Sequence, residues 1–156
     1  MSKTTLDTAD VVLNIDAAAN TAESNAWVKM LLRMYCYYCK SHNFKYEIVA
    51  DQPGRVVMVV TGAYYSRFMA EHGVHRLSRI SPFDANKRRH SSFAAVNVAE
   101  AGHGPADPCS QHIRSYILSP HCVVKELRTG YATDDPQNVL DGDLDPFIDA
   151  WLKSNS

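Results

Sequence analysis

Residues 73–93 hold the side chains best suited to chemistry, in the order GVHRLSRISPFDANKRRHSSF. A turn restricted by proline opens a loop at Ser81-Pro82-Phe83, and a basic run ending in an imidazole closes it at Lys87-Arg88-Arg89-His90. Arginine and lysine attract phosphate, an imidazole can lie on an unpaired base, and small hydroxyls can reach base edges. We therefore interpret the loop as a reader of single-stranded RNA. The alternative is a solvated hairpin whose charges keep the protein soluble.

Short apolar alternations on either side of this loop, at residues 74–80 and 91–98, are typical of half-buried strands. Similar patterns predict further strands at residues 11–17, 44–50, 55–61, 113–118 and 123–127. Apolar residues at three- and four-residue steps predict a long helix over about residues 22–42, with Asn20 as its N-cap and Glu23 near a capping-box position. Shorter helices are expected at residues 64–71, at 136–140 and near the carboxyl end. The predicted fold is α+β, a mostly antiparallel sheet packed by one long helix and several short helices.

The charges are unevenly distributed along the 156 residues, although the formal net charge is only −1. Basic residues concentrate between positions 67 and 92, whereas aspartates without any lysine or arginine lie between positions 134 and 149. Binding to RNA should therefore be local rather than a general attraction to polyanions. No apolar run approaches the roughly 18 residues that span a bilayer, and the first residues lack a secretory signal. We expect a cytoplasmic protein with no membrane partner.

The four cysteines should be reduced in the cytosol. Cys36 and Cys39 have the spacing of a redox motif, but they lie in the middle of the predicted helix, so we expect structural thiols rather than a dithiol oxidoreductase. A zinc site that adds Cys109 and Cys122 lacks ligand spacing in the second pair. The acidic segment beginning at Asp141 lacks the glycine and the final glutamate of a calcium loop. We therefore expect neither a metal nor another cofactor.

The loop and its flanking strands resemble the codon-reading segment of bacterial peptide chain release factors, of the type that reads UGA and UAA. In that family a Ser-Pro-Phe tripeptide opens the reading loop and a run similar to RRHTSF closes it, here RRHSSF at residues 88–93. Segments similar to the family also occur at residues 22–35, 110–116, 127–130 and 139–145. The resemblance covers residues 12–153 and is ungapped through the loop.

The resemblance implies that six residues recognise the codon, namely Ser81, Pro82, Phe83, His90, Ser91 and Glu23. His90 would stack on the codon between the second and third bases, Ser91 would contact the third base, and Ser81 and Glu23 would lie near the first two. Stacking on a ring contributes about 1–3 kcal/mol without base preference, and Pro82 lowers the entropy lost on binding. Phe83 is expected to pack rather than to touch a base, and Glu23 could instead close the helix cap. Phosphate contacts are expected from Arg76, Arg79, Lys87, Arg88 and Arg89.

Two domains of the family have no counterpart in the sequence, the amino-terminal helical domain and the catalytic domain with its Gly-Gly-Gln tripeptide. All seven glycines are isolated, so no Gly-Gly pair occurs. We expect a flexible segment at residues 1–10 and a single codon-recognition domain at residues 11–153, in which a joint at residues 99–109 replaces the catalytic domain. The resemblance thus implies a protein that is not an enzyme. It would bind the small-subunit decoding centre and its ribosomal RNA, recognise a stop codon in mRNA without hydrolysing peptidyl-tRNA, and compete with or modulate release factors.

Three departures from the family pattern affect codon specificity. Ser91 replaces a threonine, residues 17–21 replace a glycine-rich turn, and the acid expected near Ala26 is missing. A different function is therefore open, in which the same loop serves a repurposed single-stranded RNA-binding protein. A third possibility is a module that acts with a partner supplying hydrolysis in trans.

Overall fold

The computed structural model describes residues 10–63, 65–102 and 107–155. The predicted flexible segment at residues 1–10 lies outside the described residues except for Asp10, as do residues 103–106 of the predicted joint. Each predicted strand and helix is confirmed, with ends that move by a few residues, and the short β8 was not predicted. The elements are β1 (Val11–Ala17), α1 (Ala22–Ser41), β2 (Lys45–Gln52), β3 (Arg55–Thr61), α2 (Tyr65–Phe68), η1 (Met69–Glu71), β4 (Gly73–Ile80), β5 (Arg89–Glu100), β6 (His112–Ile117), β7 (Val123–Glu126), β8 (Ala132–Thr133), α3 (Pro136–Leu140) and α4 (Asp145–Ser154).

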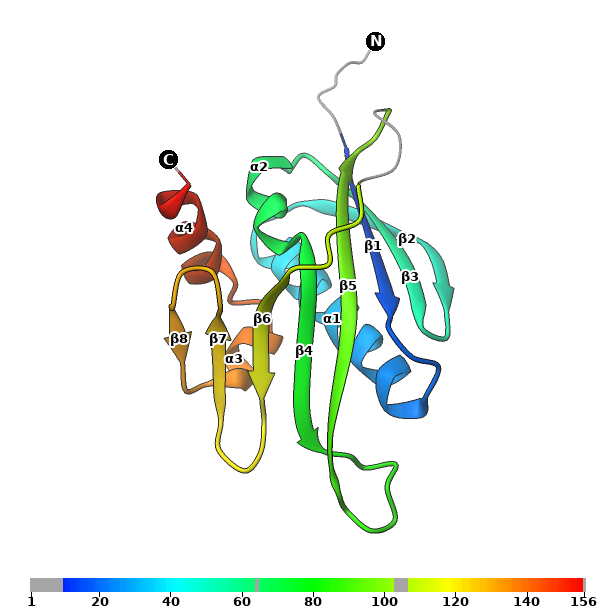
Figure 1. The fold of residues 1–156 in the computed structure, drawn as a ribbon. Coiled ribbons are helices and arrows are strands. Elements are labelled where there is room, and N and C mark those ends of the chain that lie inside the picture. The colour runs from blue at the N-terminus through cyan, green and yellow to red at the C-terminus, as the bar shows by residue number, and fades with distance from the viewer. Residues whose placement is uncertain (1–9, 64, 103–106, 156) are drawn as a thin grey trace.

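The strands form one sheet in the order β2-β3-β1-β5-β4-β6-β7-β8. All neighbouring pairs are antiparallel except β4 and β6, which run parallel. α1 lies against one face of the sheet, next to β1, β3 and β5, while α3 and α4 lie toward the β8 edge (Figure 1). The predicted α+β class, with a mostly antiparallel sheet and one long helix, is confirmed.

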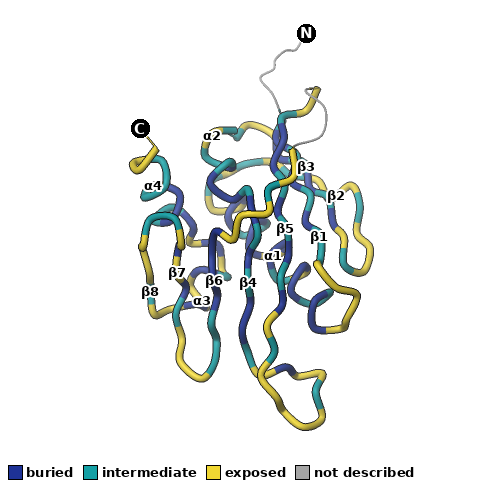
Figure 2. The backbone as a smooth tube through the Cα atoms, viewed as in Figure 1, coloured by how far each residue is buried: buried dark blue, intermediate teal, exposed yellow. Residues whose placement is uncertain are grey.

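Alternation buries one side of each central strand. Val11, Leu13 and Ile15 of β1 are fully buried and share their face with Val96 and Val98 of β5, because antiparallel partners point to the same side. Figure 2 shows burial concentrated in the middle of the sheet and declining toward the end of the β4–β5 hairpin. α1 covers the buried face with a row of residues that are at most 1% exposed: Trp27, Leu31, Met34, Tyr35 and Tyr38.

The cap of α1 differs from the prediction by one residue. Thr21, not Asn20, is the N-cap, since its Oγ1 accepts a hydrogen bond from Ser24 N–H at 3.0 Å. The capping-box position, three residues after the cap, therefore falls on Ser24 rather than on Glu23. The prediction of Asn20 as the cap is wrong, and so is the alternative that Glu23 closes the cap. This shift leaves the Glu23 carboxylate available to side chains of β4.

A buried group of charged side chains, which the sequence did not reveal, joins η1, β6 and β7. The fully buried Arg114 guanidinium donates to both carboxylate oxygens of Glu71, at 2.7 and 2.8 Å, and to Glu126 at 3.0 Å. The Tyr35 hydroxyl of α1 also donates to Glu71, at 2.9 Å. Burial alone would lower the pKa of Arg114, but the charge of Glu71 raises it, so the guanidinium stays charged. This group ties β6 to the turn that precedes β4.

Candidate functional site

The β4–β5 hairpin and the start of α1 form a pocket at one end of the sheet. The hairpin loop, defined as residues 81–90, extends past the sheet toward the beginning of α1 (Figure 1). The pocket has a volume of about 610 Å³, and five of the six predicted codon-recognition residues line it, all except Pro82. Its lining residues are Ala19, Thr21, Ala22, Glu23, Ser24, Ser81, Phe83, Asp84, Ala85, Asn86, Arg88, His90, Ser91 and Ser92.

Glu23 and Ser81 lie in the buried part of this pocket, being 4% and 2% exposed. Arg79 donates from Nε and Nη2 to the two carboxylate oxygens of Glu23, at 2.8 and 2.9 Å. The Ser81 hydroxyl donates to Glu23 Oε1 at 3.1 Å. Burial alone would raise the pKa of Glu23, but the bonds from Arg79 and Ser81 lower it below its usual value. Glu23 is therefore ionised, and it ties the end of β4 to the start of α1.

Ser81 also shapes the loop. Its Oγ accepts a hydrogen bond from Phe83 N–H at 3.2 Å, and its own N–H donates to Arg88 O at 3.1 Å. The hydroxyl is thus engaged within the protein both as a donor and as an acceptor. After the exposed Pro82, Phe83 is 58% exposed. The expectation that Phe83 packs is wrong, because the loop has left the apolar face of the sheet at this point.

Asp84 organises the loop, and sequence reasoning missed it. Its Oδ2 accepts hydrogen bonds from His90 Nε2 and from Arg88 Nε, both at 2.8 Å. Its Oδ1 accepts from Asn86 N–H at 2.8 Å. These bonds, that of His90 first, lower the pKa of Asp84 to about 2. The available signal in the sequence was an acid placed shortly before a basic run.

His90 and Ser91 point to opposite sides of β5, as consecutive residues of a strand do. The His90 side chain is 39% exposed and lies beside Asp84. The Ser91 Oγ lies 3.1 Å from Ser78 Oγ and accepts from Arg76 Nη2 at 3.3 Å. Both residues line the pocket. His90 therefore offers a partly exposed ring, whereas Ser91 offers a hydroxyl that is already bonded within the sheet.

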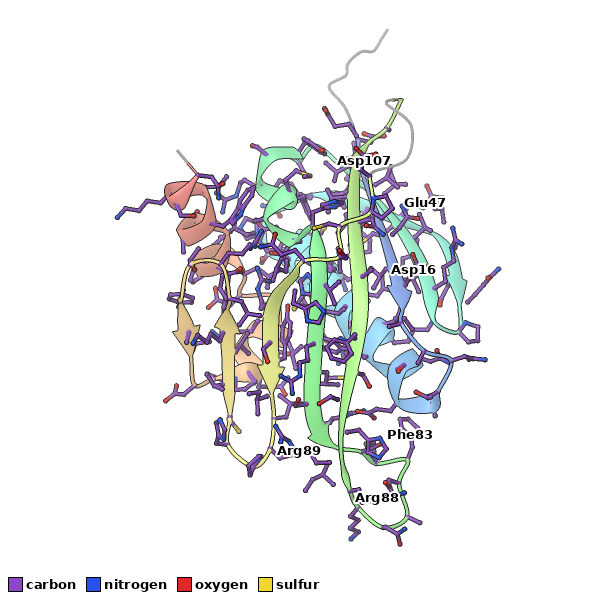
Figure 3. All side chains as sticks on the ribbon, viewed as in Figure 1. Asp16, Glu47, Phe83, Arg88, Arg89 and Asp107 are labelled. Carbon is purple, nitrogen blue, oxygen red and sulfur yellow. The ribbon has the colours of Figure 1, made fainter. Side chains whose placement is uncertain are left out.

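The five predicted phosphate contacts fall into two groups. Lys87, Arg88 and Arg89 are exposed at the end of the hairpin, where Figure 3 shows the two arginines at the opposite end of the molecule from the α4 terminus. Arg88 keeps 70% of its side chain exposed although its Nε is bonded. Arg76 and Arg79 are half-buried and bonded within the protein. The positive charge of the hairpin loop is thus presented to solvent by three consecutive residues.

The described residues offer little to metal binding or to redox chemistry of the Cys36–Cys39 pair. Within them, no three side chains among histidine, cysteine, aspartate and glutamate gather where they could hold a metal ion. Burial raises the pKa of Cys36 and raises that of Cys39 to about 12, so both form thiolates less readily than an exposed cysteine. None of the helices in the described ranges is long and apolar enough to cross a membrane.

Comparison with known proteins agrees with this geometry. The family model of the PCRF domain matches residues 1–96. The chain belongs to the peptide chain release factor family. Peptide chain release factor 2 of Lactiplantibacillus plantarum is 30% identical over 94% of this chain and 64% of its own length. That of Pseudothermotoga lettingae is 31% identical over 94% of this chain and 65% of its own length. The predicted resemblance is therefore confirmed.

The similarity to release factors extends to the fold. RF2 of Thermus thermophilus superimposes on 94% of this chain and 69% of its own, with a TM-score of 0.80 and 26% identity. The chain spans about two thirds of the length of the two bacterial release factors above and 50% of the length of chloroplastic PrfB2 of Arabidopsis thaliana. The alignment with the L. plantarum protein is 240 residues long although this chain has 156, so the relative contains residues without a counterpart here.

Proposed function

We propose that this member of the release factor family binds the decoding site of the ribosome and recognises the stop codons UGA and UAA. One observation carries the proposal. A single pocket, formed by the start of α1 and the hairpin loop, brings together Glu23, Ser81, Phe83, His90 and Ser91. A partly exposed imidazole and an ionised carboxylate in one pocket suit an unpaired base that is stacked on one face and read along one edge.

Each residue of the pocket has a separate task in this proposal. His90 supplies the stacking surface, which contributes about 1–3 kcal/mol for a base, and the exposed Phe83 extends that surface. Glu23 and Ser81 meet the base edge that enters the pocket. An ionised carboxylate only accepts hydrogen bonds, so Glu23 favours a base edge with an amino donor. Ser91 contributes a hydroxyl for the third base.

Lys87, Arg88 and Arg89 attract the RNA backbone. This attraction is independent of sequence and weakens as the salt concentration rises. Because the net charge of the chain is −1, the attraction is confined to the end of the hairpin and directs a strand toward the pocket. Pro82 restricts the loop, so less entropy is lost when the strand binds.

We further propose that the chain leaves peptidyl-tRNA intact and competes with, or modulates, complete release factors. The family resemblance places the Gly-Gly-Gln element in a separate domain between β5 and β6, where this chain has only residues 101–111. The absence of any Gly-Gly pair from the sequence supports this step. Residues 11–153 then form one codon-recognition domain, and residues 99–109, of which 103–106 lie outside the described part, stand in place of the catalytic domain.

A second candidate function is binding to single-stranded RNA without codon choice. The engagement of Ser81 favours it, since this buried hydroxyl is bonded to Glu23 and to the Phe83 N–H. A hydroxyl that already donates one hydrogen bond and accepts another is less able to change roles between adenine and guanine. Stacking on His90 and attraction to phosphate would remain, and neither depends on the base sequence.

Binding to programmed ribosomes tests codon recognition. Purified chain is titrated onto ribosomes with UGA, UAA or a sense codon in the A site, and we expect tighter binding to both stop codons. His90→Ala should reduce the affinity for stop-programmed ribosomes at least about fivefold, because a stacking contact worth about 1 kcal/mol is lost. Glu47→Ala alters an exposed residue of β2 away from the hairpin loop and is the control (Figure 3). Equal affinity for stop and sense codons, with strong binding to protein-free RNA, would support the second candidate.

A release assay tests the absence of hydrolysis. Ribosomes that carry peptidyl-tRNA at a UGA codon are mixed with the chain alone or with the chain and a complete release factor. We expect no release above background from the chain alone and slower release when both are present. Peptide release by the purified chain would refute the non-catalytic part of the proposal.

A further inference from the structure

Asp84 binds two of the side chains that the proposed function uses, His90 and Arg88. Its Oδ2 accepts from His90 Nε2 and Arg88 Nε at 2.8 Å each, and its Oδ1 accepts from Asn86 N–H at 2.8 Å. The Asp84 side chain is only 6% exposed, whereas those of Arg88 and His90 are 70% and 39% exposed. A shielded carboxylate therefore anchors two side chains that are otherwise open to solvent.

The bond to Asp84 fixes the orientation of the His90 ring. A carboxylate only accepts hydrogen bonds, so His90 Nε2 carries a proton. Rotation of the ring about its Cβ–Cγ bond would move Nε2 away from Asp84 and break this contact. Among the described residues, the Arg88 side chain is bonded through Nε, so its two terminal nitrogens face solvent-side partners such as phosphate.

Backbone hydrogen bonds close the turn, and the Asp84 side chain adds one bond to it, from the Asn86 N–H. Ser81 N–H donates to Arg88 O at 3.1 Å, Asp84 N–H donates to Ser81 O at 3.3 Å, and Lys87 N–H donates to Asp84 O at 2.9 Å. These backbone bonds define the path of the loop. The bonds from the Asp84 carboxylate to His90 and Arg88 are additional, and they act on side chains rather than on the turn. The bond from the Asn86 N–H to Oδ1 acts on the turn, whereas the two bonds to Oδ2 orient side chains, so the affinity for sense-programmed ribosomes is the readout that separates the two roles.

We infer that Asp84 is a positioning residue that presets His90 and Arg88 for an RNA strand and whose charge weakens the binding of strands that place no base on His90. The inference rests on the proposed function, because it requires that these side chains meet RNA. A ring that is already oriented loses less entropy when a base stacks on it. The negative charge also offsets one basic charge of the loop, so attraction to phosphate alone is weaker. Asp84 thereby increases the difference in affinity between a stacked codon and any other strand.

Asp84→Ala should move two measured quantities in opposite directions. The affinity for UGA-programmed ribosomes should fall about fivefold, equivalent to about 1 kcal/mol, because His90 loses its preset orientation. The affinity for sense-programmed ribosomes at low salt should rise about twofold, because the loss of the Asp84 carboxylate makes the net charge of the loop more positive. Asp84→Asn can accept hydrogen bonds on one side only, so its preference should lie between those of the wild type and the alanine variant. Glu47→Ala makes the same charge change on β2 and should leave both quantities unchanged.

The outcomes separate the inference from its alternatives. If Asp84→Ala lost affinity for stop-programmed and sense-programmed ribosomes alike, the inference would be overturned, because Asp84 would then support folding. Unchanged affinity for UGA-programmed ribosomes in Asp84→Ala, beside reduced affinity in His90→Ala, would overturn it while leaving the proposed function intact. No codon preference in the wild type would overturn both.

A second measurement needs no ribosome. Carbon-13 relaxation of the His90 ring reports its motion on the picosecond to nanosecond timescale. We expect an order parameter near the rigid limit of about 0.85 in the wild type and a value toward about 0.6 in Asp84→Ala. Equal order parameters in the two proteins would show that Asp84 does not hold the ring, and the inference would fail.

Discussion

Two arginine–carboxylate clusters lie toward opposite ends of β4 and have different surroundings. Arg114 with Glu71 and Glu126 is at most 1% exposed, whereas Arg79 beside Glu23 is 19% exposed and lies next to a pocket of about 610 Å³. The first, called the sealed cluster below, is fully buried and fixes β6 to the rest of the sheet. The second, called the open cluster, has one open side and holds the hairpin loop in place. An arginine–carboxylate pair therefore joins strands where water is excluded and supports the proposed recognition site where one side is open.

The largest expected effect comes from breaking the sealed cluster. Arg114→Leu leaves the buried Glu71 without its cation and leaves Glu126 with Arg128 alone among the charged partners described, which should lower the free energy of unfolding by about 3–5 kcal/mol. Urea unfolding followed by circular dichroism measures the loss. Arg55→Leu, in which a 64% exposed arginine is replaced, is the control and should change stability by less than about 0.5 kcal/mol. Equal losses in the two variants would contradict the distinction between the clusters.

The pH dependence of stability tests the sealed cluster without a mutation. His75 is fully buried beside Glu71 and Tyr116. Burial, and then the charge of Arg114, lower its pKa from 6.5 to about 4. The unfolded chain therefore takes up a proton before the folded chain does, and the stabilisation present above pH 6.5 is lost as the pH falls toward 4. The loss should reach about 3 kcal/mol at most.

Urea unfolding at several pH values between about 7 and 4.5 measures this slope. His75→Gln should be less stable at neutral pH but should show little change across this range. Below it, the lowered pKa values of Glu71 and Glu23 add a further loss of stability as these carboxylates are protonated. A wild-type stability that stays constant from pH 7 to 4.5 would contradict the assignment.

A smaller effect is expected from the open cluster. Arg79→Ala should cost about 1–2 kcal/mol of stability, less than Arg114→Leu, because water can reach the unpaired Glu23 through the pocket. The same change should raise the pKa of Glu23 and weaken binding to stop-codon ribosomes, since Ser81 is held by that carboxylate. Arg79→Lys keeps the charge but not the two-bond contact, so it should lie between the wild type and the alanine variant. Stability and binding are measured on the same samples.

The smallest effect is expected outside both clusters. Cys36→Ser replaces a half-buried thiol of α1 and should change stability by less than about 0.5 kcal/mol, with unaltered ribosome binding. Thermal unfolding and the ribosome-binding assay measure the two quantities. If ribosome binding depended instead on this thiol, the interpretation of Cys36 and Cys39 as structural residues would be wrong.

The strands and α1 could be predicted because their apolar residues recur with a fixed period, as Val11, Leu13 and Ile15 do in β1. The pocket residues could be nominated because they belong to one contiguous motif and to the start of the adjoining helix. Arg114 could not, since its burial depends on Glu71, which is 43 residues away in the sequence. Local alternation shows where a polar residue lies and not which partner allows its burial.

Sequence reasoning failed at two residues of the hairpin loop for a similar reason. Phenylalanine usually packs, which predicts a buried Phe83, but the sequence does not tell how far the loop extends beyond the sheet. Asp84 was overlooked because its role depends on the folding of the loop back onto itself, which brings His90 and Arg88 to one carboxylate oxygen. Both features depend on the three-dimensional path of a short segment that has no periodic pattern.

The parallel pairing of β4 and β6 has a consequence for the insertion or loss of whole domains in this family. Val74 of β4 is opposite Ala95 of β5 on one side and His112 of β6 on the other, and its N–H donates to Gln111 O at 2.8 Å. The strands on either side of the β5–β6 connection are therefore aligned by β4 rather than by the residues that connect them. An independently folding unit can be gained or lost at that connection while the register of the sheet is conserved. Protein engineers can use the same position to graft foreign modules onto this scaffold.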